Sequence, residues 1–285
     1  MTDDSTITHE AFKQFERNKF SLVAQEYDRA LAKLTGGIAV VTSQVDEAIL
    51  DVVGAKSGTR LLDVACGTGW LSTAAQKRQA IVTGLDFAEN MVAIARVRCP
   101  QGSFHHGDAE NLTFESGQFE AVVCSLGILH FPNPEKAIAE SFRVLKPGGR
   151  YAFTCWTPPT HNPFMALILG SVQTYGSMDV DLPSGPPLFR FGNPTECKMV
   201  LSAEGFTQVS VTELPIKWTF STPEDVMPKI VVSSVRLGSI LAMQSDEQRR
   251  NIENAIIEGA SKYVTEKGVE IPASVMLTLA YKPYS

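Results

Sequence analysis

An acidic residue directly before a glycine-rich turn is the feature of this sequence that most clearly indicates chemistry. The apolar segment 61–64 contains Asp63, and the turn Gly-Thr-Gly at residues 67–69 follows it, before a helix that we expect to begin at Trp70. Glycines let the backbone turn tightly and approach a ligand closely. The first N–H groups of a helix are free to bind that ligand. The junction therefore predicts a nucleotide-binding site at the end of a strand.

The turn departs from the dinucleotide-binding fingerprint, which carries a third glycine three residues after the second. Here that position holds Ser72. A carboxylate at Asp63 would repel a pyrophosphate, but it can hold an amino group or a bound water. The loop therefore favours a nucleoside joined to a zwitterionic amino-acid tail, and S-adenosylmethionine (SAM) has that shape.

Two further acids follow the next two expected strands. Asp86 ends the segment 80–86, seventeen residues after Gly69, where a carboxylate can accept hydrogen bonds from both ribose hydroxyls. Asp108 follows a short strand near residues 103–105 and lies where the adenine amino group would be in this layout. The three acids together are consistent with a bound nucleoside.

Four segments together resemble the class I SAM-dependent methyltransferases, in particular the branch of ubiquinone/menaquinone-biosynthesis methyltransferases. They are residues 63–69, 84–91, 107–112 and 143–149, in the order and at the spacing of the family. The resemblance extends over about residues 61 to 156 and does not fix a substrate. It implies an α/β fold with a doubly wound, seven-stranded Rossmann-like sheet, helical lid insertions, and SAM as cofactor.

The alternation of strands and helices also predicts a parallel, doubly wound sheet. We expect one domain over residues 1–285. Its parts are an N-terminal helical cap (1–55, with a break at Gly36-Gly37), a SAM-binding core (56–156), a lid (157–192), the rest of the core (193–220 and 269–285) and an insertion of two helices (221–268). Asn133 is expected to cap a helix that starts at Pro134. Ligands of open α/β sheets bind beyond the carboxyl ends of the strands, so the cap, lid and insertion should enclose an acceptor pocket.

The loops and the resemblance assign cofactor contacts to one set of residues. These are Tyr27, Asp63, Ala65, Gly67, Thr68, Gly69, Asp86, Phe87, Met91, Gly107, Asp108, Ala109, Ser125 and Leu126. Tyr27, followed by Asp28, resembles a Tyr-Asp pair that folds over the cofactor in this branch. Ordinary packing is the alternative role for Tyr27, Phe87 and Met91.

His130, just past the fourth expected strand, is the first candidate for a base that removes a proton from the acceptor. The alternative is a histidine that only packs or hydrogen-bonds there. His161, in the proline-rich lid, is the weaker candidate. Methyl transfer from a sulfonium needs no metal, and we expect none.

Large apolar side chains gather in the segments that should form the pocket wall. The candidates for contact with the acceptor are Trp156, Phe164, Tyr175, Phe189 and Trp218. They indicate an apolar pocket for a small organic molecule, with a small core that anchors the lid as the alternative.

Composition limits the remaining classes of function. The chain is 44% hydrophobic with a net charge of −6, whereas binding to extended nucleic acid calls for a basic face. The N-terminus lacks the apolar stretch of a signal peptide, and no apolar run approaches the roughly 18 residues of a membrane span. The five cysteines contain no C-x-x-C pair, which favours buried free thiols. We therefore expect a cytoplasmic protein with a small-molecule partner, no nucleic acid and no membrane span. The oligomeric state stays open.

The sequence thus predicts a SAM-dependent methyltransferase acting on a small, lipophilic acceptor, with oxygen favoured as the acceptor atom, then carbon, then nitrogen or sulfur. Two alternatives remain. The fold can use SAM without methyl transfer, for a cyclisation or rearrangement, or the chain can be a non-catalytic SAM-binding interaction protein.

Overall fold

The structure is a computed structural model that describes residues 4–32 and 38–284, with side chains from His9 to Arg29 and from Val41 to Tyr284. The break expected at Gly36-Gly37 lies outside the described residues. The strands are β1 (Arg60–Val64), β2 (Ile81–Asp86), β3 (Ser103–His106), β4 (Phe119–Cys124), β5 (Leu145–Trp156), β6 (Thr207–Phe220), β7 (Val264–Thr265) and β8 (Gly268–Tyr281). The helices are α1 (Asp4–Ala32), α2 (Ile38–Val52), α3 (Trp70–Lys77), α4 (Glu89–Arg98), α5 (Pro134–Val144), α6 (Pro163–Tyr175), α7 (Pro194–Ala203), α8 (Val226–Ser233), α9 (Val235–Ala242) and α10 (Asp246–Ser261).

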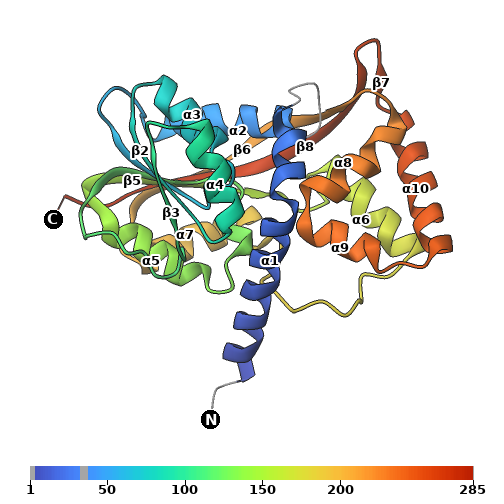
Figure 1. Ribbon diagram of the computed structural model, residues 1–285, viewed down its shortest axis with the longest axis horizontal. Helices are drawn as coiled ribbons and strands as arrows, with labels where there is room; N and C mark the ends of the chain where they lie inside the picture. Colours follow the sequence, from blue (N-terminus) through green and yellow to red (C-terminus); the bar gives the residue numbers. More distant parts are fainter. Residues whose placement is uncertain (1–3, 33–37, 285) are drawn as a thin grey trace.

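Seven strands form the central sheet in the order β3-β2-β1-β4-β5-β8-β6. The first five run parallel, and β8 lies antiparallel between β5 and β6. The predicted fold class is therefore confirmed (Figure 1). The last strand, β8, begins at Gly268, and the two-residue β7 pairs with its start.

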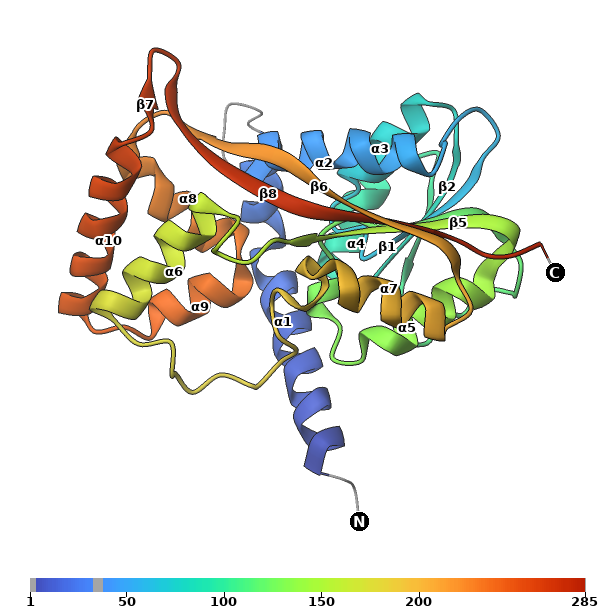
Figure 2. The same ribbon diagram turned by 180° about the vertical axis from the view of Figure 1, so that it is seen from behind.

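Helices cover both faces of the sheet, because successive side chains of each strand point to opposite faces. On β1, Leu61 packs in the cluster that includes Ile49 of α2 and Leu71 of α3. Its neighbour Leu62 packs in the cluster that includes Ile138 of α5. Figure 2 shows α2 and α3 on one side of the sheet and α5 and α7 on the other. Both faces of β1 are thus buried, which explains its nearly continuous apolar sequence.

The expected cap of α5 is wrong in one respect. Asn133 does hold the N-cap position and Pro134 follows it, but the Asn133 side chain makes no capping hydrogen bond. Instead Glu110 accepts from the Asn133 backbone N–H at 2.8 Å and from its side-chain amide at 3.4 Å. The Asn133 side chain therefore bonds to Glu110 in the neighbouring loop instead of capping α5.

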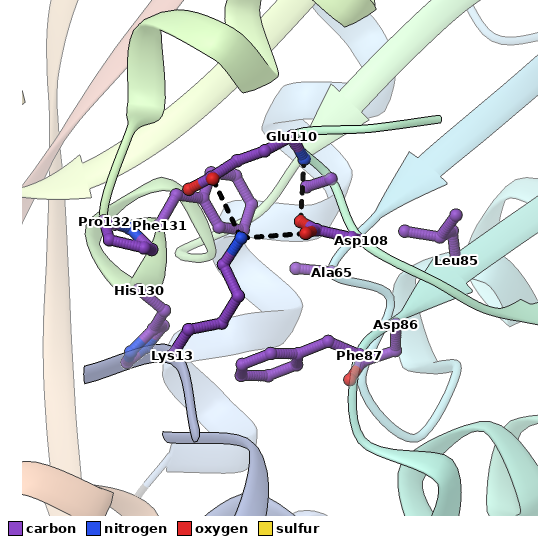
Figure 3. A pocket seen from close by; sticks show the side chains of 11 residues that line it. Lys13, Ala65, Leu85, Asp86, Phe87, Asp108, Glu110, His130, Phe131 and Pro132 are labelled. Carbon is purple, nitrogen blue, oxygen red and sulfur yellow. Dashed lines mark hydrogen bonds and ion pairs between the residues drawn. The ribbon is translucent and has the colours of Figure 1, made fainter. Parts of the chain in front are cut away.

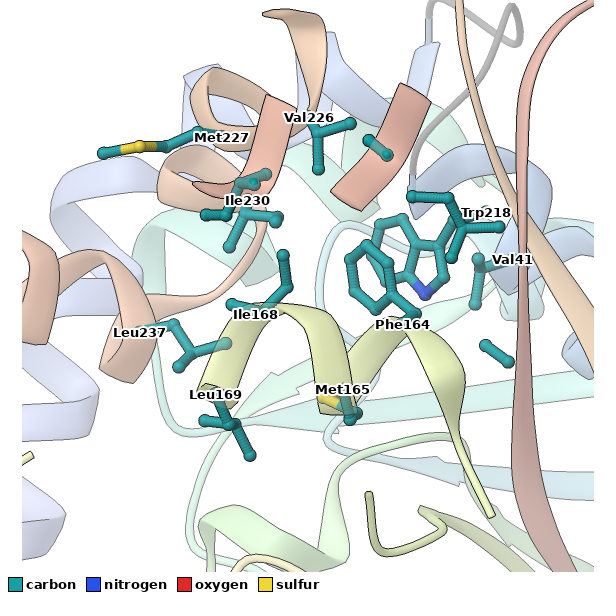
Figure 4. Packing of buried hydrophobic residues seen from close by; sticks show 14 of the residues in the cluster. Val41, Phe164, Met165, Ile168, Leu169, Trp218, Val226, Met227, Ile230 and Leu237 are labelled. Carbon is teal, nitrogen blue, oxygen red and sulfur yellow. The ribbon is translucent and has the colours of Figure 1, made fainter. Parts of the chain in front are cut away.

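The insertion after β6 contains three helices rather than two, because the chain breaks at Ser234 between α8 and α9. These helices share a core with α6 from the lid, to one side of the sheet (Figure 1). In that core the Phe164 ring stacks on the Trp218 indole with centroids 4.2 Å apart (Figure 4). The lid and the insertion are thus packed as one helical lobe.

All five cysteines are free and buried, as the sequence indicates. Within the part of the chain that the structure describes, no helix is both long enough and apolar enough to cross a membrane.

Candidate cofactor and acceptor site

The turn after β1 is held open by a hydrogen bond to the next strand. The Gly67 N–H donates to Oδ2 of Asp86 at 2.9 Å. A Cβ added at Gly67 would meet no atom within 4 Å, so this backbone borders open space that a ligand can approach. At Gly69, where φ is +82°, a Cβ would lie 3.1 Å from Ala95 of α4. Gly69 therefore serves the packing of two helices, while Gly67 is the position open to a ligand.

Two residues at the ends of neighbouring strands adopt the left-handed conformation although they carry a Cβ. They are Ala65 after β1, with φ of +57°, and Leu126 after β4, with φ of +54°. Strained backbone of this kind is concentrated at functional sites. Both residues border the cavities described below.

A cavity of about 70 Å³ lies beside the Gly67 turn, where the sequence predicts the amino-acid end of SAM. Asp63, Thr68 and Ser125 line it, and so does Asp46 of α2, which the sequence did not single out. The Thr68 hydroxyl is buried without a hydrogen-bond partner among the described residues. The Ser125 hydroxyl donates to Oδ1 of Asp46 at 3.1 Å. The cavity thus offers an orphaned hydroxyl and two buried carboxyls, which suit a ligand with an ammonium and a carboxylate.

The pKa values of both carboxyls, Asp46 and Asp63, lie close to neutral pH. Burial, with a smaller contribution from the nearby Asp63, raises the pKa of Asp46 to about 8. Burial also raises the pKa of Asp63 to about 7, although the Ser72 hydroxyl donates to this carboxyl at 2.7 Å and opposes the rise. An ammonium group bound here would favour the ionised forms.

Asp46→Asn is expected to make the cofactor-free protein more stable at alkaline pH. The folded protein keeps the Asp46 proton up to about pH 8, whereas an aspartic acid in the unfolded chain loses it near its ordinary pKa of 3.8. The free energy of unfolding therefore falls as pH rises from about 4 to about 8, because the unfolded chain binds fewer protons over that window. Asparagine does not ionise. In thermal melts, the gain in Tm over wild type should be small near pH 4.5 and largest near pH 8.5.

The same variant should bind SAM about 10–100-fold more weakly, because it loses a charge-assisted contact. Asp51→Asn is the control, since Asp51 lies exposed on the same helix and pairs with Arg78. A Tm gain that does not change with pH, together with unchanged SAM affinity, would contradict the role assigned to Asp46.

A second, smaller pocket lies at the ends of β2 and β3 (Figure 3). Asp86, Phe87, Asp108 and Ala109 line it, as expected for a ribose and adenine site. Asp86 is buried, and its Oδ1 accepts from the Ala88 N–H at 2.9 Å. Burial raises the pKa of Asp86, against the opposing hydrogen bonds from Ala88 and Gly67. Each carboxylate oxygen retains acceptor capacity for a ribose hydroxyl.

Helix α1 crosses this pocket and is held by polar contacts at two points along its length. Lys13 reaches Oδ2 of Asp108 and Oε2 of Glu110, each at 2.8 Å (Figure 3). Fifteen residues later, Asp28 pairs with Arg98 and accepts from the Trp70 indole N–H at 3.3 Å. Asp28 therefore anchors α1 to α3 and α4 instead of facing a ligand. Tyr27, beside it, borders both the amino-acid cavity and the larger cavity described next.

The larger cavity measures about 380 Å³ and lies between α1 and the helical lobe. Of the expected acceptor contacts, Trp156, Phe164, Phe189 and Trp218 line it. Tyr175 does not, because it stands at the exposed end of α6 with 47% of its surface accessible. The assignment of Tyr175 to the pocket is therefore wrong.

His130 borders both the large cavity and the adenine-side pocket. Its Nδ1 lies 2.9 Å from Oε2 of Glu16, a side chain of α1 that is fully buried. The other oxygen of Glu16 has no hydrogen-bond partner within the described residues. A buried carboxylate fixes the orientation of an imidazole and stabilises its protonated form. The structure thus brings a histidine and its carboxylate to the junction of the two cavities.

The other candidate base is placed elsewhere. The His161 side chain is 63% exposed and lies 3.8 Å from Glu213, outside all of the cavities above. Three residues that were expected to contact the cofactor instead make contacts within the protein. Met91 packs in a cluster with Ala24, the Gly107 N–H donates to the backbone of Asp86 at 3.0 Å, and Gly69 packs against α4.

Comparison with known proteins agrees with the resemblance to methyltransferases. A family model described as a methyltransferase domain matches residues 62–153. A protein of Thermus thermophilus named demethylmenaquinone methyltransferase is 36% identical in an alignment of 209 positions, which covers 66% of this chain and 91% of that protein. A protein of Renibacterium salmoninarum with the same name is 38% identical over 148 residues, covering 52% of this chain and 61% of that protein. The chain therefore spans less than two thirds of the latter.

Among solved structures, a chain from a complex between the Trm112 methyltransferase activator of Haloferax volcanii and a methyltransferase superposes with a TM-score of 0.58. It is 17% identical, and the match covers 94% of this chain and 98% of that chain. At this identity the likeness concerns the fold alone.

Proposed function

Since the chain belongs to the class I SAM-dependent methyltransferases, we propose that it transfers the methyl group of SAM to a hydroxyl of a small, largely apolar acceptor. The observation that carries the proposal is the position of His130 and Tyr27. Each of them borders the large cavity, which we assign to the acceptor, and one of the two pockets that we assign to SAM. An acceptor in the large cavity would thus meet the methyl group beside a candidate base.

The bound cofactor supplies an electrophilic methyl group on a sulfonium. Asp86 and the Gly67 turn would hold its ribose, and Asp46 with Asp63 would face its ammonium group. The walls of the acceptor cavity would hold the acceptor beside the methyl group in a fixed orientation. Such positioning can remove roughly 7–11 kcal/mol of a bimolecular barrier in favourable cases.

His130 then takes the proton of the acceptor. With Nδ1–H donated to Oε2 of Glu16, Nε2 is the free acceptor atom of the ring. Proton transfer from the acceptor hydroxyl to Nε2 leaves an imidazolium that the Glu16 carboxylate stabilises. This pairing supports a hydroxyl acceptor, because a hydroxyl needs a base far more than an amine does.

Relatives named demethylmenaquinone methyltransferase make a ring carbon of a quinol the second choice of acceptor. Removal of a proton from a ring hydroxyl also activates the neighbouring ring carbon, so the same base serves either outcome.

The test is incubation with SAM that carries a deuterated methyl group and a panel of a naphthol, a naphthoquinol and an arylamine. Mass spectrometry locates the label on oxygen, carbon or nitrogen. Label on oxygen supports the proposal, and label on a ring carbon replaces it with the second choice. SAM binding without label in any compound, combined with conversion of an acceptor, would point to cyclisation or rearrangement instead.

A further inference from the structure

Arg236 places a guanidinium at the wall of the apolar cavity without a carboxylate partner among the described residues. Its Nη1 donates to the backbone carbonyl of Pro183 at 3.0 Å, which leaves most of its five N–H donors unused by any described contact. Four other arginines pair with carboxylates, namely Arg78, Arg98, Arg143 and Arg190. Arg96 resembles Arg236 in donating to a backbone carbonyl, that of Phe104, but it does not line the cavity. A half-buried guanidinium beside apolar side chains is more weakly hydrated than an exposed one and gains from an anionic partner.

The guanidinium lies along the same wall as the His130–Glu16 pair. Its Cζ is 5.9 Å from the centroid of the Phe12 ring. Phe12 precedes Glu16 by four residues on α1, so the two side chains share one face of the helix roughly 5–6 Å apart. A ligand in this cavity can therefore contact Arg236 with one group and His130 with another.

The surroundings of Arg236 add hydrogen-bond donors. Ser234 holds the N-cap position of α9, but its side chain makes no capping hydrogen bond. Ser233 and Ser234 both line the cavity next to the first turn of α9. The unpaired N–H groups of that turn favour an anion. Beside His130, the carboxylate of Glu16 would repel an anion. An anionic group of a ligand is therefore favoured only near Arg236.

We infer that the acceptor carries a carboxylate that binds Arg236 while its hydroxyl lies at His130. This inference rests on the proposed function of the large cavity and narrows its ligand to lipophilic hydroxy acids. A carboxylate matches the planar guanidinium in a bidentate arrangement. A single arginine neutralises one negative charge, so the apolar wall disfavours a doubly charged phosphate.

The test is a calorimetric comparison of two ligands of equal size, a hydroxynaphthoic acid and the matching hydroxynaphthamide. Each is titrated into the full chain loaded with S-adenosylhomocysteine. Wild type should bind the acid about 10–100-fold more tightly than the amide. Arg236→Gln should bring the two affinities together mainly by weakening the acid, and Arg236→Lys should restore part of the preference. Arg250→Gln, at an exposed arginine of α10, is the matched control and should keep the full preference.

Equal affinities for the two ligands in wild type, or an undiminished preference in Arg236→Gln, would overturn the inference. The readout is binding and not turnover. A clear preference for the acid without methyl transfer would therefore contradict the proposed function while leaving the carboxylate site supported.

Discussion

His130→Gln is expected to lower kcat for methyl transfer by about 10²–10⁴-fold, the usual contribution of a positioned general base. Glutamine retains hydrogen-bonding groups of similar reach but cannot accept the proton at neutral pH. The KM for SAM should stay near the wild-type value, because His130 only borders the adenine-side pocket. The measurement is steady-state release of S-adenosylhomocysteine with the acceptor identified by the labelling panel.

Two further variants give this prediction its controls. Glu16→Gln should lower kcat as well, since the amide cannot stabilise the protonated imidazole as a carboxylate does. His161→Gln should leave kcat unchanged, because His161 is exposed and outside the cavities. A folded His130→Gln variant with full turnover would eliminate the histidine as the base and leave positioning as the source of catalysis.

The second large effect is expected at the ribose. Asp86→Asn should weaken SAM binding about 10–100-fold, as hydrogen bonds to a charged group contribute roughly 1.5–3 kcal/mol. Part of the loss would arise through the turn, because the Gly67 N–H donates to this carboxylate. Titration calorimetry with SAM measures the effect.

Glu89→Gln is the matched control for Asp86→Asn, since Glu89 lies exposed in the first turn of α4. It removes one negative charge near the same loop without touching the pocket. If both variants lose affinity for SAM equally, the loss would be explained by the removal of a negative charge near the loop and not by a lost contact with the ribose.

The strands and their terminal acids were predictable because their signals are local in sequence. Asp63 and Asp86 each end or adjoin a short apolar run, and parallel strands bring such ends to one edge of the sheet. The seven-stranded, doubly wound character of the sheet came from the family resemblance. The break at Ser234 that divides the insertion into α8 and α9 carries no glycine or proline, so no local signal marked it.

The sequence did not predict Asp46 and Glu16 as site residues, because their roles depend on packing between distant segments. Glu16 had a usable signal, since it shares a helical face with Phe12 and Phe20 at spacings of four residues. A carboxylate on an apolar face must find a partner when it is buried, and here the partner is His130. Asp46 likewise stands on the face of α2 that includes Val45 and Ile49. The errors at His161 and Tyr175 have the opposite cause, because lid residues can point to solvent as easily as inward.

The most direct test of methyl transfer is the ratio of S-adenosylhomocysteine formed to labelled methyl incorporated when the protein acts on a metabolite extract with labelled SAM. We expect a ratio of about one, with the label in a small, lipophilic molecule and loss of both products in His130→Gln. SAM binding with neither product, in an extract that supplies hydroxy acids and quinols, would contradict it.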